Sequence, residues 1–458
     1  MVMRDNGRMT AEAMRRQLGR RRLLQAAGGA GLALGAGWRG AAMASAQEEI
    51  TFSRDYEGAT LNLLMEDLLE TTIIEEMLPE FTELTGITVN FEKVAYDVMH
   101  EKLVPQLAAG PGNGSYDVLE VDFYWVYEFA RSGWVEDLGE RIANSGGAID
   151  LGRFIPALLD IVSQADGKTW YVPFYAYPMG LIYRDDLFND AAFRDEFAAA
   201  SGMELEIPDS VEGYVELAKA ITAWKGEELY GTAMTGAQVD PITMEFSNYL
   251  FSVGGDFYNA DLTEPIVNDA NGVKAAELYV DCINNAAQAG AASANYNDTI
   301  AVYGQGKAFS SVTFMWALAV IDGDPEAPAA NKSSQTVMPG GTGLSGAWGW
   351  GIPLSSPNPD AGWEFVRWVE SPDIVRRRAL AGSLTAQSAP YEDEEILAKY
   401  PWLPLALGMI SGGKGLPAIT KQTQLVEIVG RNLANAVAGG ATAQEAMDAA
   451  AEELKELL

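Results

Sequence analysis

Short apolar runs alternate with amphipathic segments along this chain from residue 60 onward. TLNLLM (60–65), ITVNFEKV (87–94) and YDVLEVD (116–122) are typical of strands. The segments between them have the apolar spacing of helices, and the first of them ends at Gly86, which suits a helix C-cap. Strands that alternate with helices build a mostly parallel sheet flanked by helices. The sequence therefore predicts an α/β fold.

The same alternation starts again after residue 180. Strand patterns in GLIYRDDLF (180–188), YGTAMT (230–235) and KAFSSVT (307–313) are separated by helical patterns. A chain of 458 residues is longer than a single hydrophobic core usually supports, so we expect two domains. Near the C-terminus, Thr442 and Glu445 have the spacing of a capping box that begins an alanine-rich helix.

Residues 1–46 have the features of a secretory signal peptide. Arginines precede a glycine-rich apolar run that is too short to span a membrane, and a small-x-small cleavage site ends at Ala46. Within this segment RRRLLQ (20–25) resembles a twin-arginine export signal, and an ordinary secretion signal with extra arginines is the alternative. We expect export to the periplasm and removal of the signal peptide after Ala46.

The charge of the chain excludes several classes of partner. Residues 47–458 contain 23 Lys and Arg against 62 Asp and Glu, a net charge of −39. Such a surface repels nucleic acid and anionic membranes. With Cys282 as the only cysteine and His100 as the only histidine, the chain lacks the residues for a Cys/His zinc site. A Ser–His–Asp centre has His100 as its only candidate base, and that residue lies in an amphipathic helical pattern. We expect no metal and no cofactor.

The stretch WYVPFYAYPM (170–179) is unusually aromatic: five of its ten residues carry aromatic rings. Its prolines at 173 and 178 are expected to prevent both a helix and a long strand. These rings either belong to the core or form a surface that contacts a ligand. The prolines stiffen an extended backbone, which lowers the entropic cost of ordering Tyr175 and Tyr177 around a ligand.

This stretch is also the centre of a family resemblance. Gly167, Lys168, Tyr171 and Pro173, followed by LIYRDDLF (181–188), resemble the crossover segment of bacterial extracellular solute-binding proteins of family 1, the maltose-binding-protein-like receptors of ABC importers. Arg184 replaces the usual Asn. Three further segments follow the family pattern in order: YGQGKAFSSVTFMWA (303–317), GWGIPLSSPNPDAGWEFVRWVESPD (349–373) and GGATAQEAMDAAAEELKELL (439–458).

The resemblance implies a two-lobed α/β periplasmic-binding-protein fold. One lobe is expected to contain residues 59–175 and 336–372, and the other residues 176–335 and 373–458. Each lobe is a mostly parallel sheet flanked by helices, and a multi-strand hinge joins them. Hinged lobes of this kind close on a ligand and exclude water.

Carrying the family's ligand loops over by position implies a set of ligand-binding residues: Glu66, Asp67, Asp122, Tyr124, Trp125, Tyr175, Tyr177, Trp316, Trp348 and Trp350. Rings stack on the apolar faces of a sugar while carboxylates bind its hydroxyls, so these residue types fit a carbohydrate. Core packing is the rival interpretation for each of them. We predict that Trp134, Trp363 and Trp368, which have helical or strand spacing, belong to the core.

The resemblance implies an exported receptor that captures a sugar or polyol, is not an enzyme, and delivers its solute as a monomer to the membrane permease subunits of an ABC importer. Acids beside rings also suit a cation, so a receptor for a polyamine or a betaine is an alternative. A secreted glycosidase is the enzyme-class alternative, because it needs an aromatic cleft with paired carboxylates.

Overall fold

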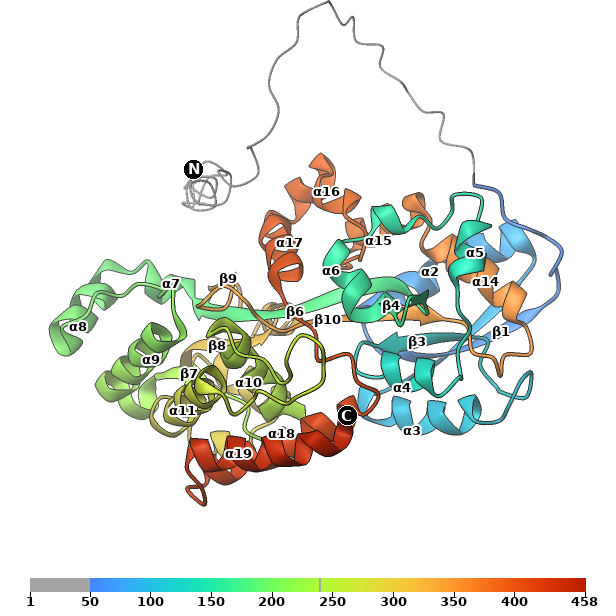
Figure 1. The fold of residues 1–458 in the computed structure, drawn as a ribbon. Helices are drawn as coiled ribbons and strands as arrows, with labels where there is room; N and C mark the ends of the chain where they lie inside the picture. The colour runs from blue at the N-terminus through green and yellow to red at the C-terminus, as the bar shows by residue number, and fades with distance from the viewer. Residues whose placement is uncertain (1–49, 239) are drawn as a thin grey trace, which may run out of the picture. The chain divides into compact units, whose positions relative to one another are not determined.

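The computed structural model describes residues 50–458 apart from residue 239 (Figure 1). The predicted signal peptide, with its twin-arginine motif and its cleavage site after Ala46, lies outside these described residues. Residues 50–458 form one compact unit. Within the described part of the chain, every helix is too short or too polar to cross a membrane.

The strands form two groups that share one long strand, β6 (Val172–Arg184). In the first group, parallel pairs join β1 to β2 and β3, and β10 lies antiparallel between β3 and β6. In the second group, β8 and β9 pair antiparallel with the later half of β6, and β7 pairs parallel with β8. The bounds of these strands are β1 Thr60–Glu66, β2 Thr88–Val94, β3 Val118–Asp122, β7 Tyr230–Ala233, β8 Ala308–Phe314, β9 Ser333–Thr336 and β10 Ser345–Gly351; β4 (Gln164–Ala165) and β5 (Lys168–Thr169) form a separate hairpin.

β6 changes partners at its second proline. Its residues up to Pro178 pair with β10, and those from Met179 onward pair with β8. Pro173 lies at an irregularity of the β6–β10 ladder, where Trp348 pairs with Tyr175 and Gly349 with Pro173, so that Phe174 is an extra, unpaired residue. Prolines are tolerated in a strand at such bulges and at changes of partner.

Helices cover both groups of strands. α2 (Leu69–Thr85) and α14 (Pro359–Val369) pack together on the first group, and α15 (Pro372–Ala381) packs on α2. α17 (Leu403–Gly412) lies against β6, as Figure 1 shows. The other helices on the side of the first group of strands are α3 Tyr96–Leu107, α4 Val126–Arg131, α5 Gly139–Ala143, η1 Leu151–Arg153, α6 Pro156–Leu158, η2 Leu159–Ser163, η5 Ala389–Tyr391 and α16 Glu394–Lys399.

Around the second group, α9 (Val211–Lys225) packs on β7, and α11 (Ala270–Asn285) packs on α9 and α10 (Asp240–Ser252). Two helices from the C-terminus, α18 (Gln422–Val437) and α19 (Ala443–Leu454), pack on α10 and α11. The other helices here are α7 Asp185–Phe188, α8 Ala191–Ser201, η3 Gly226–Glu228, η4 Ala291–Ser293, α12 Tyr296–Gly304, α13 Trp316–Gly323 and η6 Lys455–Leu457.

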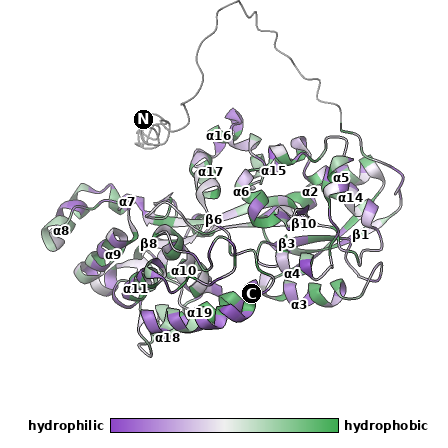
Figure 2. Cartoon of the chain, in the orientation of Figure 1, coloured by the Kyte–Doolittle hydropathy of each residue, from purple (hydrophilic) through white to green (hydrophobic). Residues whose placement is uncertain are grey.

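α19 illustrates how a sequence pattern becomes a packed element. The predicted capping box is confirmed: Thr442 accepts a hydrogen bond from the Glu445 N–H, and Glu445 accepts one from the Thr442 N–H. In Figure 2 the helix carries both hydrophobic and hydrophilic residues along its length. Its apolar residues Ala446, Met447, Ala450 and Leu454 are buried, which ties the C-terminus to the second group of strands.

The core is rich in aromatic residues. Every residue of β3 and β10 is buried. Trp363 and Trp368 are buried, which confirms their predicted place in the core, and Trp134 is half-buried and packs at its edge. Phe365 contacts Phe81 edge-on, with ring centroids 5.7 Å apart, so α14 and α2 are held together through their rings.

Candidate ligand-binding site

Several strands end, and several helices begin, at one place in the fold. β1 ends at Glu66, β3 at Asp122 and β8 at Phe314, while α10 begins at Asp240 and α13 at Trp316. In α/β proteins the carboxyl ends of the strands are where ligands bind. The side chains at these ends therefore define the candidate site.

Asp122 is the polar centre of this region. Its carboxylate accepts hydrogen bonds from the hydroxyls of Tyr96, at 2.7 Å, and of Tyr177. Burial raises the pKa of Asp122 to about 6, although both tyrosine hydroxyls act to lower it. Backbone N–H groups of Tyr124 and Phe123 also hydrogen-bond to this carboxylate and act to lower its pKa. Asp122 is therefore an acceptor on which several donors converge, and a ligand hydroxyl would join or replace one of them.

Tyr177 reaches Asp122 across an intervening strand. Tyr177 belongs to β6, Asp122 to β3, and β10 lies between them. The residue of β10 opposite Tyr177 is Gly346, and a Cβ there would lie 2.2 Å from the Tyr177 ring. Only glycine leaves room for this ring, which explains one glycine of the glycine-rich strand.

Aromatic rings line the same face of the first group of strands. Trp125 stacks on Tyr96 with centroids 5.5 Å apart, and it contacts Trp348 edge-on at 5.8 Å. Trp348 in turn lies nearly parallel to the ring of Tyr175, at 6.1 Å. These rings surround Asp122 with flat apolar surfaces of the kind that pack against the C–H faces of a sugar.

Tyr177 also links this face to the second group of strands. Its ring contacts Phe314 edge-on at 5.6 Å, and Phe314 stacks with Trp316 at 6.2 Å. Tyr296, the first residue of α12, contacts Phe314 from another side at 5.6 Å. Trp316 is 41% exposed, so it is a surface ring at the edge of this cluster rather than part of the core.

Acidic groups from both groups of strands meet here. Burial, and then the charge of Asp122, raises the pKa of Asp240 to about 7. Burial, followed by the charges of Asp122 and Glu70, raises the pKa of Glu66 to about 8. The neighbouring charges that act most strongly on these groups come from other acids, so the site has a negative or proton-bearing character. Among the described residues, no group of three or more His, Cys, Asp and Glu side chains is arranged to hold a metal ion.

The structure brings most of the predicted ligand residues together. Glu66, Asp122, Trp125, Tyr175, Tyr177, Trp316 and Trp348 belong to the connected cluster described above. Tyr124 is buried. Burial, followed by the charges of Asp240 and Asp122, raises its pKa, which indicates that Tyr124 lies close to this cluster. Asp67 is exposed in the turn between β1 and α2.

Trp350 has a different place from the one expected. It is fully buried, its ring lies 4.2 Å from that of Phe174 and 5.6 Å from that of Phe365, and its Nε1–H donates to Glu370 at 3.0 Å. Trp350 therefore packs in the core under α14. The family resemblance implied that Trp350 binds ligand together with Trp348, but this end of β10 is covered by a helix.

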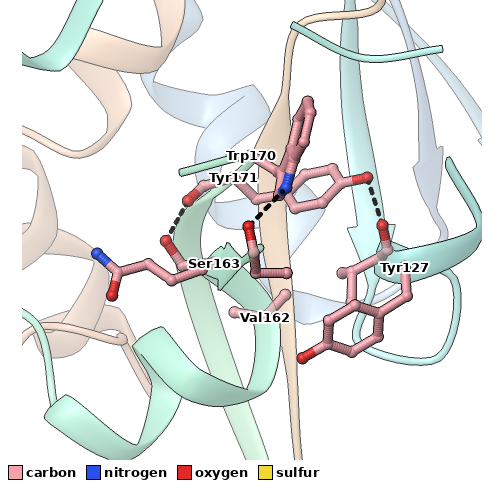
Figure 3. A pocket seen from close by; sticks show the side chains of 8 residues that line it. Tyr127, Val162, Ser163, Trp170 and Tyr171 are labelled. Carbon is pink, nitrogen blue, oxygen red and sulfur yellow. Dashed lines mark hydrogen bonds between the residues drawn. The ribbon is translucent and has the colours of Figure 1, made fainter. Parts of the chain in front are cut away.

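The aromatic stretch at residues 170–179 contributes some of its rings to the core and others to the candidate site. Trp170 and Tyr171 line a small cavity of about 10 Å³ with Tyr127 and Val162, shown in Figure 3. There Trp170 donates to the Ala165 carbonyl and Tyr171 to the Val126 carbonyl. This cavity has room for about one water molecule and not for a solute. Phe174 is buried, and only Tyr175 and Tyr177 join the ligand cluster.

Sequence reasoning missed Tyr96, Asp240, Tyr296 and Phe314. Each lies at a strand end or in the first turn of a helix, so the rule that selected Asp122 would have selected them once the strand and helix limits were known. Asp240 begins α10, and nothing in the sequence pattern indicated that it lies close enough to Asp122 for the charge of Asp122 to raise its pKa.

Comparison with known proteins identifies the family. The profile of the family described as bacterial extracellular solute-binding protein matches residues 67–375, and the chain belongs to this family. The erythritol/L-threitol-binding protein of Mycolicibacterium smegmatis is 26% identical over 416 residues, which cover 82% of each protein. A probable amino-acid ABC transporter periplasmic-binding protein of Sinorhizobium fredii is 23% identical over 352 residues, 76% of this chain and 78% of that protein.

A solved structure agrees with this assignment. The ABC transporter solute-binding protein of Agrobacterium radiobacter K84, in complex with ribitol, aligns with a TM-score of 0.74 and 25% identity and covers 88% of this chain and 99% of that chain. The likeness confirms the predicted α/β fold of a solute-binding protein.

Proposed function

We propose that this protein is the exported receptor of an ABC import system and that it captures a neutral polyol or sugar. The observation that carries the proposal is the Asp122 cluster: a buried carboxylate bonded to two tyrosine hydroxyls and enclosed by the rings of Trp125, Trp348 and Tyr175. Such a site offers hydrogen-bond acceptors to hydroxyls and flat surfaces to C–H groups, which a polyol carries together. The erythritol/L-threitol-binding relative and the ribitol-bound structure support the same ligand class.

The strand arrangement supports the proposal of two lobes that close on the solute. We assign one lobe to the strands that pair with β6 before Pro178 and the other to those that pair with it after Met179. The expected boundaries at 175/176 and 335/336 are close to these changes of partner. The last expected boundary, at 372/373, is less favoured by the contacts, since α15 packs on α2 and α17 on α6, and only α18 and α19 pack on α10 and α11. A boundary between α17 and α18 fits these contacts better.

In this proposal each lobe and the strand shared between them contribute contacts to the solute. Asp122 accepts hydrogen bonds from the solute from the first lobe, Tyr175 and Tyr177 contact it from the shared strand, and Trp316 stacks on it from the second lobe. Asp240, at the start of α10, lies close enough to Asp122 for the charge of Asp122 to raise its pKa, so closing the lobes is proposed to bring two acids toward one solute. A solute whose hydroxyls donate to both carboxylates compensates the repulsion between them, which favours the closed state only when ligand is bound.

The remaining parts of the proposal concern export and partners. Residues 1–46 direct the chain to the twin-arginine route and are removed after Ala46, and the mature monomer delivers its solute unchanged to membrane permease subunits. N-terminal sequencing of the exported protein tests the cleavage site: a first residue other than Gln47 would contradict it.

Isothermal titration calorimetry of the purified protein tests the ligand class. The panel contains erythritol, L-threitol, ribitol, D-mannitol and maltose, with glycine betaine and spermidine as cations and glutamine as an amino acid. We expect at least one polyol or sugar to bind with a micromolar or lower Kd, and to be recovered unchanged after incubation. Binding confined to betaine, spermidine or glutamine would contradict the neutral-polyol proposal, and hydrolysis of a glycoside would indicate an enzyme.

A further inference from the structure

Three side-chain oxygen atoms near Tyr175 are buried without any hydrogen-bond partner. They are Oε1 of Glu120, the hydroxyl of Tyr175 and Oγ1 of Thr385. The three residues are 0%, 4% and 1% exposed. Buried polar atoms in folded proteins almost always have a partner, because leaving one unpaired costs free energy. A group of such atoms therefore points to something polar that they are built to meet.

Thr385 lies directly beside Tyr175. The N–H of Ala176 donates to the Leu384 carbonyl at 2.9 Å, and the N–H of Ala386 donates to the Phe174 carbonyl at 3.2 Å, so Tyr175 and Thr385 form an antiparallel bridge between these two bonds. In a pair of this kind the two side chains are at their closest approach and face the same side. The Thr385 carbonyl accepts from the Tyr391 hydroxyl at 2.9 Å, which fixes this backbone while leaving the Thr385 hydroxyl unpaired.

Glu120 faces the same space from the other side. It lies two residues before Asp122 on β3, and β10 pairs Trp350 with Glu120 and Trp348 with Asp122. Because Trp348 also pairs with Tyr175, these side chains share one face of the strands. Oε2 of Glu120 accepts from the Glu66 N–H at 2.7 Å, and only Oε1 is left unpaired. The charge of Glu120 is the strongest neighbouring charge on the Tyr175 hydroxyl.

We propose that Glu120, Tyr175 and Thr385 form a second polar subsite, adjoining the Asp122 cluster, that binds the hydroxyl groups at one end of the captured polyol. The inference rests on the proposed function and extends it. A hydroxyl both donates and accepts, so it satisfies a carboxyl oxygen and two hydroxyls at once, whereas the methyl groups of a betaine satisfy none of them. Ser383, whose buried Oγ is also unpaired, lies two residues before Thr385 and extends the subsite along this segment.

This subsite gives a role to a segment that none of the ligand motifs in the sequence covered. Residues 383–387 follow α15 and return to β6, where Ala176 and Phe174 hold them by backbone hydrogen bonds. The end of the solute bound by Glu120, Tyr175 and Thr385 lies next to Glu66 and away from Trp316. Solutes that lack a hydroxyl at that end are therefore discriminated against, since three buried groups then stay unpaired.

Thr385→Val tests the subsite against a purely structural role. The substitution keeps the shape of the side chain and removes a hydroxyl that has no partner in the ligand-free protein. We expect the Kd for the tightest-binding member of ribitol, erythritol, L-threitol and D-mannitol to rise threefold to tenfold, which is the effect of about one hydrogen bond. The Tm of the ligand-free protein is expected to stay the same or to rise.

Thr85→Val is the matched control. Thr85 is as deeply buried, but its hydroxyl donates to the Phe81 carbonyl at 2.7 Å and accepts from the Ile87 N–H at 3.1 Å, at the end of α2. Its loss is expected to lower the Tm and to leave the Kd unchanged. Tyr175→Phe is a second test variant, because it removes the other unpaired hydroxyl. If both hydroxyls contact one solute hydroxyl, the rise in Kd of the double variant is expected to be smaller than the two single effects combined.

The outcomes separate this inference from the proposed function. If the parent protein binds a polyol and Thr385→Val binds it equally well, or if Thr385→Val lowers the Tm as Thr85→Val does with no change in Kd, the subsite is refuted while the polyol receptor stands. If the parent protein binds none of the polyols or sugars, the proposed function fails and this inference fails with it.

Discussion

Two buried polar clusters meet at adjacent residues of β6, and they differ in how completely their hydrogen bonds are satisfied. The first surrounds Glu370 and Arg378, both essentially unexposed, and contacts Phe174. Arg378 donates to Glu370 at 2.7 Å and to the carbonyls of Val369 and Phe174, and Glu370 also accepts from Trp350. The second surrounds Tyr175, where Glu120, Tyr175 and Thr385 each have an unpaired atom.

The difference is the basis for assigning a structural role to the first cluster and for proposing a ligand-binding role for the second. The Glu370–Arg378 cluster pairs its own charges and donors, so it stabilises the protein without help from a ligand and fixes the bulge at Phe174. The Tyr175 cluster leaves its buried groups unpaired, which lowers the stability of the ligand-free protein and becomes binding energy when a solute supplies the missing partners. Adjacent residues of one strand therefore serve opposite purposes.

Removing the charge of Arg378 is expected to have the largest effect. Arg378→Met leaves Glu370 buried without its ion partner, and we expect the free energy of unfolding to fall by about 3–5 kcal/mol. Chemical denaturation measures this change. Arg367→Met is a control, because the Arg367–Glu364 pair is more exposed and does not contact β6, and it should cost less. Equal losses for the two variants would show that the Arg378 cluster has no special structural role.

Asp122→Asn should instead act on binding. A hydrogen bond to a charged acceptor contributes about 1.5–3 kcal/mol, so we expect the Kd for a bound polyol to rise by about tenfold to a hundredfold. The free energy of unfolding should change little or rise, because the substitution removes a buried charge. Titration calorimetry and chemical denaturation measure the two effects. A large loss of stability with unchanged affinity would place Asp122 among the structural residues.

The acids of the ligand-binding region also predict a pH dependence. The pKa values of Asp122, Asp240 and Glu66 are raised to about 6, 7 and 8, so the folded protein holds these protons more tightly than the unfolded chain. Their contribution to stability is fully present below about pH 4, where the unfolded chain is also protonated, and is lost as the pH rises from there to the folded-state pKa values of about 6, 7 and 8. We expect the free energy of unfolding of the ligand-free protein to fall between pH 5 and 8.5 by several kcal/mol in all, since each pH unit by which a folded-state pKa lies above that range's lower end corresponds to about 1.4 kcal/mol.

Asp240→Asn isolates this contribution from the general repulsion of an acidic surface. The variant should lose less stability than the parent protein over the same pH range, because one of the acids with a raised pKa is gone. Glu92 and Asp393 have lowered pKa values, owing first to hydrogen bonds from Lys102 and Arg376, so they titrate below this range. Parallel pH profiles for the parent protein and the variant would contradict the assignment.

The smallest expected effect belongs to the exposed ring at the edge of the ligand-binding region. Trp316→Ala should raise the Kd by about fivefold, since a stacked ring contributes about 1 kcal/mol beyond its buried area, and should leave the Tm nearly unchanged. If Trp316→Ala unfolds the protein, the ring is structural.

Phe174→Ala is the control with the opposite expectation. It removes a ring buried under Arg378, so it should lower the free energy of unfolding by about 3–5 kcal/mol.

Much of this arrangement follows from local properties of the sequence. The alternation of apolar runs and amphipathic segments determined the α/β class, because strand and helix periodicities are local. The capping box at Thr442 and the core positions of Trp363 and Trp368 followed in the same way. The prolines around Tyr175 and Tyr177 excluded a helix, as expected. The expectation that they also exclude a long strand is wrong, because Tyr175 and Tyr177 lie in the 13-residue strand β6, which tolerates its prolines at a bulge and at a change of partner.

Only the tertiary structure decided which of these residues meet. The bulge at Phe174, the glycine opposite Tyr177 and the helix over Trp350 depend on which strands become neighbours, and neighbours in this sheet are separated by up to hundreds of residues in the chain. Thr385 joins Tyr175 because a segment after α15 returns to β6. The start of α10 comes close enough to the end of β3 for the charge of Asp122 to raise the pKa of Asp240. The sequence by itself determined the kinds of residue that a solute site needs. Long-range pairing determined which of them share one face with unpaired hydrogen-bonding groups, because such pairing is set by the packing of the whole fold.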